Sequence, residues 1–251
     1  PLVLGLSYLT LTLHLLAMGF TFGSVVLLVW AHLRPAGSVA AQAPFLGTSL
    51  PLGFSYLTTF GVPPLLFVQV VYGQYFYTSS VLMGGFWILV IPLLIVGYGL
   101  AYLHKLTRAA RPRPQAWLVA LLALCMLAVG YAYVSNFTLM LTPSRWLARY
   151  SAHPAGGALN PGEPTVHPRL LLFLSTGLVT AGLGLAWRGS VLSGWGLVDQ
   201  GRVAQRLGVR SMLIGASLAV VGGIATVVAL PPAPRALLAA GGTPTALTGG
   251  V

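Results

Sequence analysis

The sequence has almost no acidic residues. Glu163 and Asp199 are its only carboxylates in 251 residues, against 13 Lys and Arg, and neither lies inside a long apolar run. Membrane proteins that move protons or cations usually keep an acidic residue in their core, because a charge in hydrocarbon is costly and survives only where it is needed. The scarcity of carboxylates argues against such a pathway. It leaves histidine, tyrosine, glutamine, arginine and bound groups as the available chemistry.

Several binding motifs are also missing from the sequence. Cys125 is the only cysteine, so the chain cannot form an internal disulfide, and it contains no C-x-x-C or C-x-x-C-H. A phosphate-binding glycine loop, a dinucleotide-binding G-x-G-x-x-G and an H-E-x-x-H are absent as well. We therefore expect no nucleotide, no iron–sulfur cluster, no zinc and no covalent c-type haem.

Long apolar runs dominate what remains. Hydrophobic residues make up 57% of the chain, charged residues 6%, and the mean hydropathy is +0.87. A helix of about 20 apolar residues crosses a ~30 Å hydrocarbon core. The sequence thus predicts an all-α polytopic membrane bundle, a single transmembrane domain over 1–251. The six predicted spans are 4–33, 51–73, 81–104, 116–141, 169–188 and 211–231.

The distribution of basic residues predicts the orientation. Nine lie in or next to the links after the first, third and fifth spans, and four lie on the other side. Because positive loops stay in the cytoplasm, we expect cytoplasmic basic loops at 105–115 and 189–210. Both termini, a short aromatic turn at 74–80 and a loop at 142–168 are then outside.

The second predicted span is interrupted by Pro63 and Pro64, which remove two backbone donors. We expect a kink, followed by an aromatic-polar stretch that contains Gln69 and Tyr72. That stretch is either an interfacial aromatic belt or part of a binding site. Small-residue pairs in three other spans indicate close helix packing, either within the chain or with another subunit. These pairs are Gly19/Gly23, Gly177/Ala181 and the stripe Gly215/Ala219/Gly223.

Among the five histidines, His14 lies well inside an apolar span. A neutral imidazole there needs a partner for its donor and its acceptor. That partner is either a haem iron, a quinone or a neighbouring group of the protein. His32 and His104 fall at the cytoplasmic ends of their spans. They are either ordinary interfacial residues or a pair that holds a group there.

The predicted outer loop is long for a helical bundle, and such loops are often functional. His153 and His167 are its two histidines. Arg145, Arg149 and Arg169 either clamp a carboxylate or propionate, or belong to an interfacial amphipathic helix.

These features resemble, at the level of general pattern, the integral membrane subunits of bacterial respiratory electron-transfer complexes. The residues behind the resemblance are His14, the Pro63-Pro64 break leading to Gln69 and Tyr72, and the stretch from Asn136 to Arg169. The resemblance implies a b-type haem or a quinone near the outer face. His14 and His167 are then candidate metal ligands, with His153, Met18 or Met83 as alternatives. The candidate cofactor-binding residues are His14, His153, His167, Arg145, Arg149, Arg169, Gln69 and Tyr72.

Three functions remain open at this stage. The first is an electron-transfer subunit in a bacterial-type plasma membrane, with other membrane and peripheral subunits, cytochromes among them, as partners. The second is a non-redox structural anchor of a membrane complex. The third is an anion or small-solute transporter, against which the lack of visible inverted repeats argues. None of the three involves nucleic acid, because the basic residues are accounted for by topology.

Overall fold

The computed structural model describes residues 2–107 and 112–239, and every regular element in these ranges is helical. Six helices are long and apolar enough to cross a membrane, which confirms a multi-pass, all-α membrane bundle. They are α1 (Leu2–Leu33), α2 (Ser38–Val71), α4 (Gly84–Leu106), α5 (Pro112–Met140), α7 (Val166–Gly194) and α8 (Val198–Ala229). Shorter helices are α3 (Gly73–Leu82), η1 (Pro143–Arg145), α6 (Trp146–Ala152) and α9 (Pro232–Ala239).

Several expected links are helical instead. The aromatic turn expected at 74–80 is helix α3, and α2 begins at Ser38, within the link expected at 34–50. The prediction of a basic loop at 189–210 was wrong, because only residues 195–197 separate α7 from α8. Polar residues can continue a helix beyond the hydrocarbon, so hydropathy alone ended these helices too early. Of the loop expected at 105–115, residues 108–111 lie outside the described ranges.

Helix α2 continues through its prolines. Pro63 and Pro64 lie inside one uninterrupted helix, as do Pro44 and Pro51. Hydroxyl groups bond to backbone carbonyls along this helix; for example, the Thr48 hydroxyl donates to the Pro44 carbonyl over 2.8 Å. A proline frees the carbonyl four residues before it, so this bond to the carbonyl of Pro44 itself is an ordinary side-chain bond to the helix backbone.

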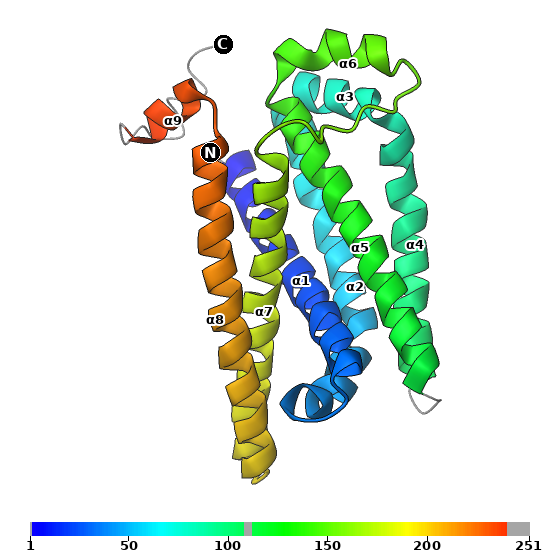
Figure 1. Ribbon diagram of the computed structural model, residues 1–251, viewed down its shortest axis with the longest axis vertical. Coiled ribbons are helices and arrows are strands. Elements are labelled where there is room, and N and C mark those ends of the chain that lie inside the picture. Colours follow the sequence, from blue (N-terminus) through cyan, green and yellow to red (C-terminus); the bar gives the residue numbers. More distant parts are fainter. Residues whose placement is uncertain (1, 108–111, 240–251) are drawn as a thin grey trace.

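The main core lies among α1, α2, α4, α5 and α7, with Leu50, Phe54 and Leu122 fully buried at its centre. Helix α7 packs on α1, and α8 packs chiefly on α7 at the edge of the bundle (Figure 1). Helices α3 and α6 lie across one end, which we call the α3–α6 end, where α1 begins and α9 lies (Figure 1). The opposite end, where α7 turns into α8, is the hairpin end.

Glycine contacts bring the helices together within this chain. A Cβ at Gly208 would lie 2.5 Å from the Gly182 carbonyl oxygen, so α7 and α8 touch backbone to backbone. Gly23 meets Gly177 in the same way between α1 and α7, and Gly215 lies against the backbone of Ser175. Packing within the chain therefore accounts for these parts of the predicted stripes, whereas Gly223 faces open space.

Candidate functional site

His14 receives its partner from α2. Its Nδ1 lies 3.0 Å from the carbonyl oxygen of Leu57, which can only accept, so Nδ1 carries the proton and donates. The half-buried imidazole lies against Gly61, where a Cβ would be 2.9 Å from its Cε1. The structure thus satisfies the donor of His14 inside the chain and leaves Nε2 as the acceptor of a neutral ring.

His32 and His104 come together near the hairpin end. Their ring centroids are 6.4 Å apart and the rings are nearly perpendicular, at 86°. His104 is buried and lies over Gly47 of α2, closer than a Cβ there would permit. The sequence left this pairing open, and the structure places the two rings in edge-to-face contact.

A buried polar network fastens the segment after α5. Asn160 is fully buried; its Nδ2 donates to the Thr138 hydroxyl over 3.1 Å, and its Oδ1 accepts from Arg149 Nη2 over 3.2 Å. Trp146 donates through Nε1 to the Leu139 carbonyl over 2.8 Å. One predicted clamp residue, Arg149, is therefore engaged within its own loop.

The second part of this network lies at the start of α7. Glu163 is buried, and its carboxylate accepts from both the backbone N–H and the hydroxyl of Thr165. Arg169 donates through Nε to the same hydroxyl over 3.1 Å. Arg169 thus also has a partner inside the chain, and the local role of Glu163 is to shape the entry into α7.

The other predicted residues of the loop are exposed. Arg145 and His153 are exposed on and after the short helices, and His167 is exposed with its ring 6.4 Å from that of Tyr131. No cluster of three or more metal-binding side chains occurs in residues 2–107 and 112–239. His14 donates to Leu57 of α2, whereas His153 lies on the exposed surface of the loop and His167 at the exposed start of α7.

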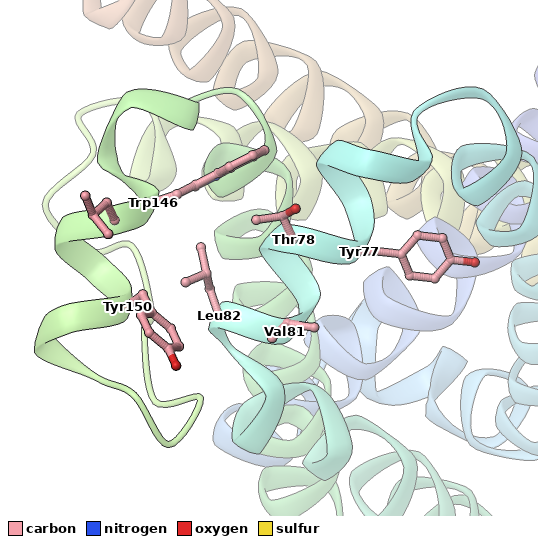
Figure 2. A pocket seen from close by; sticks show the side chains of 7 residues that line it. Tyr77, Thr78, Val81, Leu82, Trp146 and Tyr150 are labelled. Carbon is pink, nitrogen blue, oxygen red and sulfur yellow. The ribbon is translucent and has the colours of Figure 1, made fainter.

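An open cleft of about 500 Å³ lies between α3 and α6. It is lined by Tyr77, Thr78, Val81, Leu82, Trp146, Leu147 and Tyr150. In Figure 2, Tyr150 and Leu82 both extend into the gap between α6 and α3, whereas Tyr77 points away from α6. The Thr78 hydroxyl donates to the Gln74 carbonyl, the Tyr77 hydroxyl to Gln69 and Trp146 Nε1 to the Leu139 carbonyl, so the Tyr150 hydroxyl is the donor of the lining that these bonds do not use.

Two predicted residues lie close to this region. Gln69 accepts a bond from the Tyr77 hydroxyl over 3.3 Å, and so it braces a residue of the cleft without lining it. Tyr72 lines a separate, smaller pocket of about 60 Å³, together with Tyr8 and Phe67. The loop arginines Arg145, Arg149 and Arg169 line neither the cleft nor this smaller pocket.

The spacing of residues on α3 and α6 is a sequence signal for this cleft. On α6, Trp146 and Tyr150 are four residues apart, and on α3 Thr78, Val81 and Leu82 follow at helical spacing. Residues with this spacing share one face of a helix. Two short facing helices with such faces predict a shared groove.

The fold defines this chain as a multi-pass α-helical membrane protein. Hydrogen bonds hold the loop between α5 and α7 in place at the α3–α6 end. No known family model matches the chain, and no curated protein is significantly similar to it.

Proposed function

We propose that this chain is a membrane subunit of a multi-subunit respiratory electron-transfer complex, and that it borders a quinone at the α3–α6 end. By the distribution of basic residues, this end faces outward in a bacterial-type plasma membrane. The observation that carries the proposal is the cleft of about 500 Å³ between α3 and α6. The cleft is open to its surroundings, and like small-molecule sites it has mostly apolar walls with a few polar groups.

The chemistry of the cleft suits a quinone. A quinone head is a flat ring with two carbonyl acceptors, and its tail is apolar. Leu82, Leu147 and the Trp146 ring offer apolar surface, and the Tyr150 hydroxyl can donate to a carbonyl. Because α3 and α6 lie across the end of the bundle (Figure 1), a tail can leave the open cleft toward the lipid.

Quinone is favoured over haem at this end by the positions of the histidines. His14 donates to a backbone carbonyl of α2, and His153 and His167 are exposed. The proposal therefore assigns binding to the aromatic residues of the cleft and assigns His14 a structural bond. Oxidation and reduction of the quinone would be the work of partner subunits that carry the electron donors or acceptors.

Photoaffinity labelling of the purified chain in lipid nanodiscs tests this proposal. An azido-quinone should label the peptides that contain 77–82 and 146–150, and an unlabelled short-chain quinone should compete. Val81→Trp fills the cleft from an exposed position and should reduce labelling at least about fivefold, the effect of losing roughly 1 kcal/mol. Val70→Trp is the matched control, since Val70 is similarly exposed on α2 and does not line the cleft. Equal labelling of all three proteins would refute the proposal.

A structural anchor is the second candidate, and the bond from His14 to Leu57 favours it. Its Nδ1 donor is bonded within the chain, so that side of the ring needs no cofactor. In the intact complex this role predicts that Val81→Trp leaves electron transfer unchanged, while a change such as Gly223→Leu, at a position that is open in this chain, releases the partner subunits.

A further inference from the structure

Three arginines form a row on α8 near the hairpin end. Arg202, Arg206 and Arg210 follow at intervals of four residues, and all three are exposed. Residues four apart lie above one another on one helix face. The face toward α7 is made of Gly201, Gly208 and Gly215, which touch its backbone. By the helical spacing the arginine row lies on the opposite side, away from the bundle.

The same face continues into the part of α8 that contacts lipid. Leu213 and Ile224 are 63% and 61% exposed, and by helical spacing both share the face of Arg206. Such large apolar side chains are exposed because the surrounding medium is hydrocarbon. The arginine row is therefore the continuation of a lipid-facing surface beyond the apolar core.

The length of α8 places this row at the depth of lipid headgroups. Its 32 residues extend about 48 Å at 1.5 Å per residue, whereas the hydrocarbon core is ~30 Å thick and each headgroup layer adds about 5–8 Å. With the apolar span beginning after Arg210, Arg210 and Arg206 lie in the headgroup layer and Arg202 lies one turn beyond. Figure 1 shows α7 and α8 extending past α1, α2, α4 and α5 at this end.

Two exposed tryptophans support this depth. Trp187 on α7 and Trp195 in the turn are 72% and 75% exposed. Tryptophan is enriched at membrane interfaces, where its ring lies among the headgroups. The hairpin end thus carries both interfacial rings and a row of positive charges.

The chain cannot neutralise this row by itself. Asp199 lies 3.9 Å from Arg202 in an exposed pair. The only other carboxylate of the sequence, Glu163, is buried in the loop at the start of α7. Anions for Arg206 and Arg210 must come from outside the chain. Guanidinium groups bind phosphates through two parallel hydrogen bonds, which a lysine cannot make.

We propose that Arg202, Arg206 and Arg210 form a binding site for the phosphates of anionic phospholipids in the leaflet at the hairpin end. The proposal is independent of the quinone site at the other end. A phospholipid is the occupant because the row continues a lipid-facing surface at headgroup depth. Each basic residue near such a surface contributes about fivefold in affinity.

Native mass spectrometry of the full chain, released from nanodiscs with mixed phosphatidylcholine and phosphatidylglycerol, provides the test. The wild type should retain phosphatidylglycerol preferentially. The triple variant Arg202→Gln, Arg206→Gln, Arg210→Gln should lose this preference by more than about tenfold, while a single Arg206→Gln should lose about fivefold. Thermal unfolding in pure phosphatidylcholine nanodiscs shows that the variants are folded.

The matched control is the double variant Arg34→Gln, Lys105→Gln, which removes exposed charges at the same end but away from the row. It should keep most of the preference. Unchanged retention in the triple variant would overturn the proposal. The same result is expected if an acidic protein, rather than a lipid, occupies the row. Equal losses in the control and in the single Arg206→Gln variant would also overturn it, because they would show an effect of net charge and not of a site.

Discussion

His32 and His104 meet edge to face at 6.4 Å, and His104 lies over Gly47 of α2. One imidazole thus touches two helices, α1 and α2, that come from other parts of the chain. The contact is possible because residue 47 has no side chain. Gly61 provides the same space for His14 nearer the middle of the membrane.

Replacing Gly47 with Ala should destabilise the fold. A Cβ at this position would overlap the His104 ring, which is buried and cannot move freely. Overpacking of this kind costs about 1–3 kcal/mol, so the thermal unfolding midpoint in detergent should fall. Gly99→Ala is the control, because nothing lies within 4 Å of its Cβ position. A Gly47→Ala variant as stable as Gly99→Ala would contradict the predicted contact.

His14→Ala should also lower stability, and without an effect on bound pigment. The change removes the bond to the Leu57 carbonyl and leaves space beside Gly61. A hydrogen bond of this kind contributes about 1 kcal/mol. Denaturant unfolding checks the loss, with His153→Ala, at an exposed position, as the neutral comparison. If His14→Ala instead removed a Soret band from the purified chain, the histidine would be a haem ligand.

The α7–α8 contact should be sensitive to added volume. A Cβ at Gly208 would meet the backbone of Gly182 and Ala186, which cannot turn aside as a side chain can. Gly208→Ala should therefore cost at least about 1–3 kcal/mol. Gly223→Ala on the same helix should be tolerated, since its Cβ position is open. The check is to measure the thermal unfolding midpoints of the two variants in parallel. Equal midpoints would show that α7 and α8 are farther apart than in this structure.

Asn160→Ala should loosen the loop between α5 and α7. The variant leaves the Thr138 hydroxyl and the Arg149 guanidinium without their shared partner. Losing such a buried partner costs about 1–3 kcal/mol. Limited proteolysis should then cut between residues 142 and 165 faster than in the wild type. Ser144→Ala, at an exposed position of the same loop, should leave the cutting rate unchanged.

The sequence was sufficient for the class of the protein and for the number of spans. Long apolar runs have one physical solution in a bilayer, and all six predicted spans correspond to helices. The ends of the helices were less predictable. Arg202 and Arg206 were assigned to a loop because they are charged, although their spacing of four residues was already helical.

The candidate site was predictable only in part. Polarity drew attention to the loop after α5, but it could not show that Arg149 and Arg169 donate to Asn160 and Thr165. Those bonds depend on how the loop folds back on itself, and local sequence patterns do not predict that path. The partner of His14 was equally unpredictable. Every residue has a backbone carbonyl, so the sequence does not indicate which one accepts the bond.

The backbone contact between Gly182 and Gly208 has a consequence for biosynthesis. Neither α7 nor α8 can cover its small-residue surface before the other is present, and only residues 195–197 separate them. The two helices therefore have reason to leave the translocon as a paired unit. The insertion machinery would handle these two helices in a single step.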